Sequence, residues 1–246
     1  MTLTVHARYE PQNWPTPVAD DLWMVDGPEI RFGFGVKVPF PTRMTIVRLS
    51  GDGLWLHSPI APEPELVARV RALGPVRVLL APNRLHYWWL SEWAGLFPEA
   101  AVFIPPGLAQ TAKKSLPDHQ TLGHEPSPVW ADTMDQLMVA GSIVTEVVFF
   151  HRASRTLILT DLIENFELHR VRSRSVRLLL RMGGVVDPDG KAPIDMRLSY
   201  LGHRAELRDV VRKMLAWRPE RVILAHGRWY DRDGEQELRR AFRWVL

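Results

Sequence analysis

The chain has 246 residues, of which 46% are hydrophobic and 24% charged, and its 31 basic and 28 acidic residues leave a formal net charge of only +3. This composition is typical of a globular protein with a sizeable core, and the length predicts one domain over residues 1–246. The sequence contains no cysteine. Disulfides, thiol catalysis and thiolate metal sites are therefore excluded, so any metal ligands must be His, Asp or Glu.

Targeting signals are also missing from the sequence. No stretch approaches the roughly 20 apolar residues of a membrane span. The N-terminal residues lack the basic start and apolar stretch of a signal peptide. We therefore expect a cytoplasmic protein that has no membrane partner.

The first half of the chain contains short apolar runs separated by turn signals. Residues 1–20 hold three prolines and little periodicity, which predicts an irregular N-terminal arm. Strands are predicted over residues 22–27, 44–49, 54–57, 76–81 and 102–104. Residues 28–41 hold two glycines and three prolines and predict a loop. Helical spacing predicts helices over residues 62–73 and 87–96.

The second half repeats this alternation. Residues 117–134 predict a long connection, and residues 183–193 a loop. Strands are predicted over residues 136–139, 146–150, 156–160 and 221–225, and helices over residues 168–182, 196–217 (with a break near Gly202) and 234–244. Strands paired through turns and followed by helices predict two mixed sheets packed face to face, with helices outside.

The densest basic patch lies within the helix predicted over residues 168–182. Its members are Arg170, Arg172, Arg174, Arg177 and Arg181. Nucleic acid or an anionic membrane can bind such a patch. More often it is the solvated face of a helix, and we adopt that interpretation over a nucleic-acid surface.

Three strongly apolar strands are followed by side chains that can bind a metal. His86 follows the strand at residues 76–81, Asp161 ends TLILTD, and His226 ends RVILAH. In layered α/β proteins, ligands bind outside the carboxyl ends of strands. We therefore expect these three side chains to converge there.

Two imidazoles and a carboxylate suit zinc, iron or manganese. Three protein ligands with one open position are typical of a catalytic metal site. Such an ion can lower the pKa of water to about 7 and polarise an ester, amide or phosphate. The pattern thus predicts a divalent metal, with zinc first, and a small-molecule substrate. Glu146 and His57 are the residues expected to assist.

Each of the three residues also has a structural interpretation. Asp161 precedes LIENF and could cap a helix, His226 could be a hydrogen-bonded turn residue, and His86 could be packed against Trp88 and Trp89. A GxSxG elbow, a phosphate-binding GxxxxGK[ST] loop and a GxGxxG loop are all missing from the sequence.

Several stretches resemble the metallo-β-lactamase fold superfamily, and more closely a branch of it without an assigned function. They are LWMVDG, LWLHSPI, VLLAPNRLHYWWLSEWAGLFPEA, EVVFFHRASRTLILTDLIENF and VILAHGRWY, which together span roughly residues 20–230. The resemblance implies an α/β fold, a four-layer αββα sandwich, and metal-dependent hydrolysis.

The superfamily's HxHxDH metal motif is degenerate here. The corresponding stretch is PNRLHY, in which both leading histidines are missing, His86 falls at or next to the aspartate, and Tyr87 replaces the last histidine. The resemblance matches Asp161 to the bridging aspartate and His226 to the final histidine. Glu146 is the nearest candidate for the histidine before the second hairpin. The broken motif implies either a reduced, mononuclear site or a site that has lost its metal.

Two functions remain open from the sequence. The first is a hydrolase-like enzyme in which His86, Asp161 and His226 bind one divalent ion. The alternative is a non-catalytic module that keeps the fold, has lost the metal and binds a small molecule or a protein in a pocket lined by Tyr87, Trp88, Trp89 and Trp229.

Overall fold

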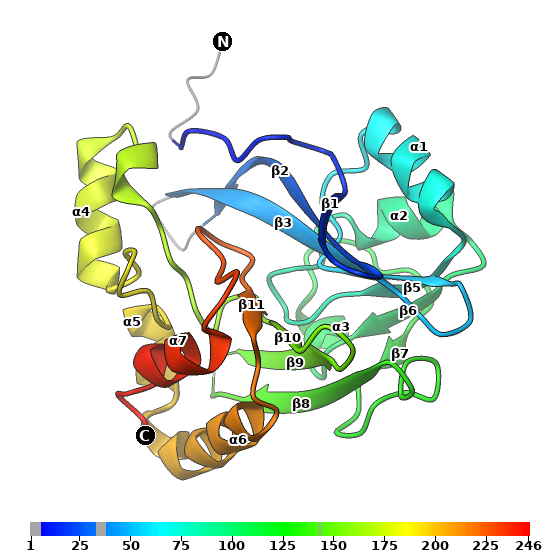
Figure 1. The fold of residues 1–246 in the computed structure, drawn as a ribbon. Helices are drawn as coiled ribbons and strands as arrows, with labels where there is room; N and C mark the ends of the chain where they lie inside the picture. The colour runs from blue at the N-terminus through cyan, green and yellow to red at the C-terminus, as the bar shows by residue number, and fades with distance from the viewer. Residues whose placement is uncertain (1–5, 33–37, 143) are drawn as a thin grey trace.

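The computed structural model describes residues 6–32, 38–142 and 144–246, which form two β-sheets and the helices around them (Figure 1). In the larger sheet the strands pair in the order in which they occur along the chain. They are β1 (Thr16–Ala19), β2 (Leu22–Phe32), β3 (Val38–Arg48), β4 (Leu54–His57), β5 (Val76–Leu80), β6 (Ala101–Ile104) and β7 (Gln120–Thr121). The smaller sheet has the order β11-β10-β9-β8. Its strands are β8 (Met134–Ala140), β9 (Thr145–His151), β10 (Thr156–Ile158) and β11 (Arg221–Ile223).

Helices cover the outer face of each sheet. Those beside the larger sheet are α1 (Pro64–Leu73), α2 (Leu90–Leu96) and α3 (Leu108–Thr111). The later helical segments are η1 (Leu168–Arg170), α4 (Arg174–Gly183), α5 (Ile194–Ser199), η2 (Leu201–His203), α6 (Arg204–Ala216) and α7 (Gly234–Ala241). None of the helices among the described residues is long and apolar enough to cross a bilayer.

Three cores show that the layers are helix, sheet, sheet and helix. One packs the larger sheet against α1 and α2, through residues such as Leu79 and Trp93. A second lies between the sheets, where Trp55 meets Phe149. A third packs the smaller sheet against α6 and α7, and Phe242 is one of its fully buried members. The four-layer αββα sandwich expected from the sequence is confirmed.

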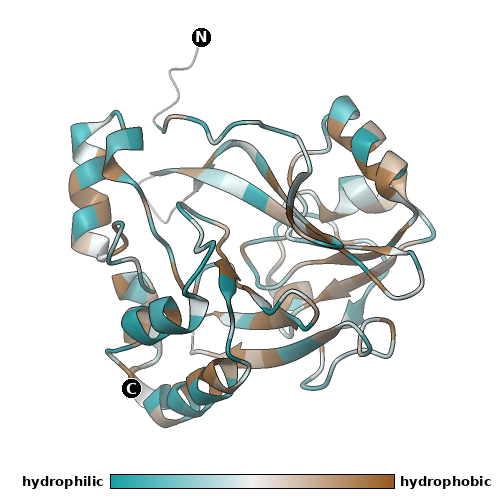
Figure 2. Ribbon diagram, in the orientation of Figure 1, coloured by the Kyte–Doolittle hydropathy of each residue, from teal (hydrophilic) through white to brown (hydrophobic). Residues whose placement is uncertain are grey.

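The strands are apolar on both faces because each face packs on a different layer. In β9, Val147 and Phe149 point into the core between the sheets, whereas Val148 and Phe150 point toward the helices. This is the period of two that a strand imposes on its side chains. The hydropathy colouring in Figure 2 shows hydrophobic residues along the strands of both sheets.

The loop predicted over residues 28–41 is wrong, because β2 and β3 continue through most of it as a long antiparallel pair. The two glycines that favoured a loop lie outside the described residues. Pro39 and Pro41 are tolerated because β4 pairs with β3 only from Thr45 onward, so their missing N–H groups face no second neighbour. Similarly, β1 occupies part of the stretch expected to be an irregular arm.

Two further predicted elements differ from the structure. The long helix predicted over residues 196–217 is divided into α5, η2 and α6, because the chain turns at Tyr200, whose ring is fully buried. The predicted connection at residues 117–134 contains β7, which pairs with the end of β6.

The carboxyl ends of the parallel strands of both sheets meet at one edge of the sandwich. β4 and β5 run parallel in one sheet, and β10 and β11 run parallel in the other. A backbone hydrogen bond from Val147 N to Pro82 O, 2.9 Å long, joins the sheets at this edge. The loops that follow β4, β5, β10 and β11 are therefore neighbours in space.

Candidate metal site

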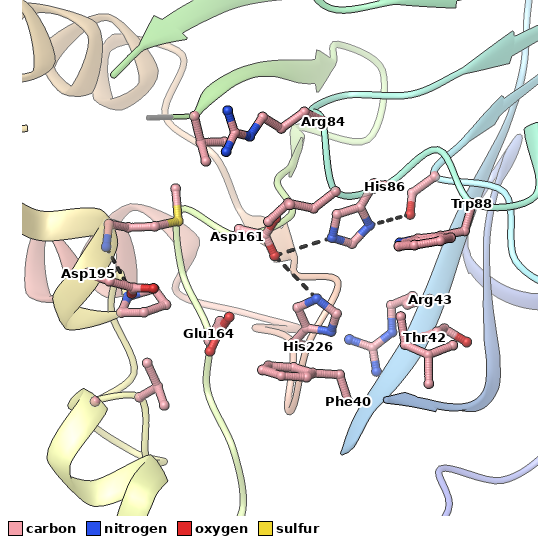
Figure 3. Close-up of a pocket in the computed structure, with 18 of the residues that line it drawn as sticks. Phe40, Thr42, Arg43, Arg84, His86, Trp88, Asp161, Glu164, Asp195 and His226 are labelled. Atoms are coloured by element: carbon pink, nitrogen blue, oxygen red, sulfur yellow. Dashed lines mark hydrogen bonds and ion pairs between the residues drawn. The ribbon is translucent and has the colours of Figure 1, made fainter. Parts of the chain in front are cut away.

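His86, Asp161 and His226 converge at this edge, on the loops after β5, β10 and β11 (Figure 3). Nε2 of His86 and Nε2 of His226 each lie 3.2 Å from the same carboxylate oxygen, Asp161 Oδ1. The three candidate ligand atoms lie within 4.8 Å of one another. The convergence that we expected from the positions of these three residues at strand ends is therefore confirmed.

The other nitrogen of each imidazole has an oxygen partner. His226 Nδ1 lies 2.8 Å from the carbonyl oxygen of Pro41, and His86 Nδ1 lies 2.7 Å from Ser58 Oγ. A carbonyl oxygen only accepts, so His226 donates from Nδ1, which assigns its tautomer. Its Nε2 lone pair then faces a carboxylate oxygen, and two acceptors in contact need a shared proton or a cation between them.

This arrangement fits a divalent metal ion. Metal-binding histidines usually donate their second N–H to an oxygen, which orients the ring and leaves the other nitrogen free for the ion. His226 is held in this way, and the Ser58 hydroxyl can accept from His86 Nδ1 in the same manner. Two imidazole nitrogens and one carboxylate form a donor set found around catalytic zinc and non-haem iron.

Behind the cluster, a buried polar network fixes Asp161. Asn83 Nδ2 donates to Asp161 Oδ2 at 2.7 Å, to Thr160 Oγ1 at 2.9 Å and to Glu146 Oε2 at 3.2 Å. Asn83 Oδ1 accepts from the backbone N–H groups of Leu85 and His86. One fully buried amide thus sets both the carboxylate of Asp161 and the loop that carries His86.

Glu146 supports the same carboxylate from the start of β9. Its two oxygens accept from the backbone N–H of Thr160 at 2.7 Å and of Asp161 at 2.9 Å. Burial and the nearby charge of Asp161 raise the pKa of Glu146, although the hydrogen bonds from Thr160 and Asp161 oppose this shift. Its side chain is fully buried and does not line the pocket.

His57 was expected to assist at the site, but it faces away from the pocket. Its ring stacks on Trp55 at 5.3 Å and meets Phe149 edge-on at 5.7 Å. Burial, followed by the charge of His86, lowers the pKa of His57 to about 3. The residue at the strand end that does reach the pocket is the next one, Ser58.

Charge within the cluster favours an ionised aspartate. Burial alone would raise the pKa of Asp161, but the charge of His86 and the close contacts with the imidazoles of His226 and His86 lower it well below the usual value. Burial alone would lower the pKa of His86, whereas the charge and hydrogen bond of Asp161 and the charge of Glu146 raise it. A negative carboxylate between two imidazoles is an electrostatic environment that attracts a cation.

Backbone contacts position His226. Asn165 N donates to His226 O at 3.2 Å, and Arg228 N donates to Asn165 O at 2.8 Å. Between them Gly227 adopts φ +86°, and a Cβ there would lie 2.1 Å from Asn165 O. The Arg43 guanidinium, held by Asp26, also donates to the carbonyls of Leu224 and Gly227. Only glycine fits this close approach of two chain segments.

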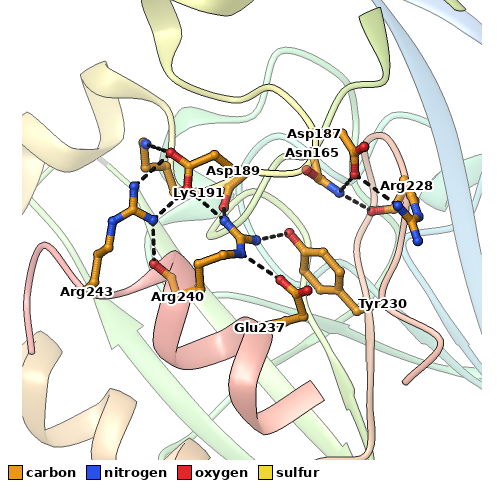
Figure 4. A network of polar contacts seen from close by, with 10 residues as sticks. Asn165, Asp187, Asp189, Lys191, Arg228, Tyr230, Glu237, Arg240 and Arg243 are labelled. Atoms are coloured by element: carbon orange, nitrogen blue, oxygen red, sulfur yellow. Dashed lines mark hydrogen bonds and ion pairs between the residues drawn. The ribbon is translucent and has the colours of Figure 1, made fainter. Parts of the chain in front are cut away.

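A surface network continues this support (Figure 4). Asn165 Nδ2 donates to Asp187 Oδ1 at 3.0 Å and to Arg228 O at 3.1 Å. Nearby, Asp189 pairs with Arg243 at 2.6 Å and with Arg240 at 3.1 Å, which ties the loop before α5 to α7. The chain on both sides of His226 is therefore anchored.

The cluster lies in the wall of a cavity of about 490 Å³, a size typical of small-molecule sites. Most of its lining is apolar, and it includes Ile30, Phe40, Pro59, Ile60, Leu85, Trp88, Trp89, Val144, Leu179, Leu180, Val185 and Met196. Of the four aromatic residues considered from the sequence, Trp88 and Trp89 line the cavity. Tyr87 and Trp229 do not; the hydroxyl of Tyr87 instead accepts from Lys113 N.

Four charged-type residues of the lining were not singled out from the sequence, namely Arg43, Arg84, Glu164 and Asp195. Glu164 is buried, and this burial together with the charges of Asp161 and Asp195 raises its pKa well above the usual value. Arg84 has no ion-pair partner among the residues that the structure describes. The carboxyl group of Glu164 is thus suited to donating a proton and the guanidinium of Arg84 to binding an anion.

A family model described as "Domain of unknown function (DUF4336)" matches residues 19–173, more than half of the chain. The chain belongs to this DUF4336 family. The matched range includes His86 and Asp161 but ends before His226. No curated protein matches the chain.

Solved metallo-β-lactamases share the fold of this DUF4336 member. The structure of DIM-1 exposed to ceftazidime is 14% identical, with 96% of this chain and 99% of that chain covered and a TM-score of 0.64. The enzyme from Hirschia baltica is 13% identical, with coverages of 94% and 97% and a TM-score of 0.61. FIM-1 from Pseudomonas aeruginosa, in a mono-zinc form, is 13% identical, with coverages of 96% and 97% and a TM-score of 0.59. At these identities the likeness establishes the fold.

Apart from Glu146, sequence reasoning missed the residues that hold the three candidate ligands in this DUF4336 member. Asn83 carried a usable signal, since it follows Pro82 directly at a strand end, where an amide often organises the next turn. Ser58 carried a weaker one, its place after the strand that ends at His57. The partner of His226, the carbonyl of Pro41, left no signal, because any residue offers a carbonyl.

Proposed function

We propose that this chain is a metal-dependent hydrolase-like enzyme with a mononuclear site, in which His86, Asp161 and His226 hold one divalent ion. The observation that carries the proposal is the convergence of two Nε2 atoms on Asp161 Oδ1, while both Nδ1 atoms are engaged elsewhere. Zinc suits this donor set, and iron or manganese are the alternatives.

When bound, the ion would supply Lewis-acid activation of a carbonyl or phosphoryl group. The protein's own residues would do the rest. Glu164, whose pKa is raised by burial and by the charges of Asp161 and Asp195, would donate a proton to the leaving group. Arg84 would hold an anionic group of the substrate, and the apolar wall formed by Trp88 and Leu180 would exclude water.

Glu146 and His57 then assist from behind the site. Glu146 fixes Asp161 through the backbone and through Asn83, and His57 packs the strand that presents Ser58. The substrate class is that of a small molecule with an apolar portion and a hydrolysable ester, thioester, lactam or phosphodiester bond.

Metal analysis of the purified protein tests the proposal. We expect one equivalent of divalent metal and a lower melting temperature after chelation, because an ion bound only to the folded state stabilises it. Asp161→Asn should lose the metal and keep the fold, and the exposed-site variant His119→Gln should keep both. Metal-free wild-type protein that melts unchanged with or without added zinc would contradict the proposal and support the non-catalytic binding module.

One observation favours a second candidate, hydrolysis through a serine nucleophile. Ser58, His86 and Asp161 are joined by contacts of 2.7 Å and 3.2 Å, and Ser58 lines the cavity with a positive φ of 54°. A hydroxyl, an imidazole and a carboxylate in this order activate serine on several folds, where the hydroxyl contacts Nε2 and the carboxylate Nδ1; here the two ring nitrogens are exchanged. Covalent labelling of Ser58 by a fluorophosphonate in metal-free protein, abolished in Ser58→Ala, would favour it. Unlabelled Ser58 in a folded metal-free protein would exclude it.

A further inference from the structure

A second feature lies on the outside of the molecule, on α4, α5 and η2. Of the ten large hydrophobic residues that are exposed among the described residues, six lie here. They are Leu178, Leu179, Met182, Ile194, Leu198 and Leu201. We call this set the α4–α5 surface. Scattered exposed hydrophobic residues are ordinary, but a cluster indicates a contact surface.

The apolar residues form stripes along neighbouring elements. Leu178 and Met182 are four residues apart on α4 and are 57% and 61% exposed. Ile194 and Leu198 have the same spacing on α5. The guanidinium of Arg197 on α5 reaches the carbonyl of Gly183 at the end of α4, and Figure 1 shows the two helices next to each other.

Helix α4 is attached to the rest of the protein by few apolar side chains. Leu180 is its only buried residue, whereas Leu178, Leu179 and Met182 face outward. In Figure 2 the helix shows strongly hydrophilic and strongly hydrophobic segments side by side. Three of its large apolar residues are thus exposed and one is buried, which is the reverse of an ordinary surface helix.

On α4 and in the segments next to it, the charge beside the exposed leucines has one sign. From Leu168 to Val186 the chain contains five arginines and no acidic residue. Arg172, Arg174 and Arg181 are exposed and have no ion-pair partner within the described part of the chain. Helix α5 carries one acidic residue, Asp195, in its first turn.

The surface is continuous with the cavity. Leu179 is 40% exposed and also lines the cavity, together with Leu180 and Gly183 from α4 and Met196 from α5. A solvated basic face, the interpretation adopted from the sequence, accounts for the arginines. It does not account for the leucines between them.

We propose that the α4–α5 surface docks on an anionic lipid bilayer. The leucines and Met182 enter the boundary between headgroups and acyl chains, and Arg172, Arg174 and Arg181 pair with lipid phosphates and carboxylates. A basic amphipathic helix that lies in the plane of the interface binds in this way without spanning the bilayer. This goes beyond the proposed function and does not depend on the metal.

Vesicle co-sedimentation tests the proposal with the full chain. We expect binding to phosphatidylcholine vesicles that contain phosphatidylserine, and much weaker binding to phosphatidylcholine alone. Arg174→Gln with Arg181→Gln should lower the partition coefficient by about 30-fold, since each arginine contributes ~1 kcal/mol at an anionic surface. Leu178→Ser with Leu198→Ser should lower it at least as much.

Matched controls keep the test independent of folding. Val129→Ser and Arg232→Gln change an exposed hydrophobic residue and an exposed arginine elsewhere, and should bind as the wild type does. All variants should melt at the wild-type temperature. Equal binding to both vesicle types, or binding unaffected by the α4 and α5 variants, would overturn the proposal. A dimer abolished by Leu178→Ser with Leu198→Ser, or RNA binding abolished by the arginine variant, in the absence of vesicle binding would overturn it as well.

Discussion

Ser58 Oγ lies 2.7 Å from His86 Nδ1, on the side of the imidazole ring that faces away from Asp161. If His86 binds a metal through Nε2, Ser58 is the acceptor that fixes its tautomer. Ser58→Ala should then lower the affinity for zinc by about 10- to 100-fold. Competition with a chromophoric chelator measures this, and Ser50→Ala, in an exposed turn, is the control. An unchanged zinc affinity would show that Ser58 does not fix the tautomer of His86 for metal binding.

Glu146 links the two sheets to the carboxylate of Asp161. Glu146→Gln replaces an acceptor oxygen by an NH₂ group opposite the backbone N–H of Thr160 or Asp161. A buried donor without a partner costs about 1–3 kcal/mol, so the free energy of unfolding should fall by that amount. Urea denaturation measures the change, and Glu125→Gln, at an exposed position, should leave stability unaltered. Equal stability of the wild type and Glu146→Gln would show that the hydrogen bonds from Thr160 and Asp161 to Glu146 do not stabilise the fold.

The lowered pKa of His57 predicts that the stability of the folded protein depends on pH. Its folded pKa of about 3 lies below the ordinary value of 6.5, so the unfolded chain binds a proton between these values and the folded chain does not. Stability should therefore rise with pH from about 3 to 6.5, by at most about 1.4 kcal/mol per unit, and be independent of His57 above that range. His57→Phe should remove this dependence, as seen by comparing unfolding curves of the two proteins at each pH. Parallel pH profiles would show that His57 is protonated in the folded state.

Gly227 is predicted to be indispensable next to His226. At φ +86° and 2.1 Å from Asn165 O, a Cβ would force apart the segments that hold His226. Gly227→Ala should lower the free energy of unfolding by at least about 2 kcal/mol. Gly202→Ala is the matched control, since a Cβ there meets nothing within 4 Å. Similar melting temperatures for the two variants would show that the chain relaxes around Gly227.

The layers of the fold and the convergence of the three candidate ligands could be predicted from the sequence. Buried strands such as β5 and β9 are nearly continuous apolar runs, and a histidine or aspartate after such a run falls at the sheet edge. The length of the β2–β3 pair was not predictable from the sequence. The prolines at its far end indicate a loop, and they fit a strand only because β4 does not pair with that end of β3. Likewise, the break at Tyr200 depends on burial of its ring between layers.

The hydrogen-bond partners within the site could not be predicted from the sequence, for a different reason. The partners of Asp161 and His226 are Asn83, Glu146 and the Pro41 carbonyl, which lie far away in sequence and are specified by packing alone. Glu146 and His57 were selected as strand-end residues, but one faces the backbone and the other Trp55. The single domain over residues 1–246 and the cytoplasmic location stay predictions.

A zinc soak followed by an anomalous difference map at the zinc edge tests the central claim most directly. We predict one peak, about 2 Å from Nε2 of His86, Nε2 of His226 and Oδ1 of Asp161. If these atoms remain in mutual contact and no peak lies among them at saturating zinc, the account of a metal-dependent site is contradicted.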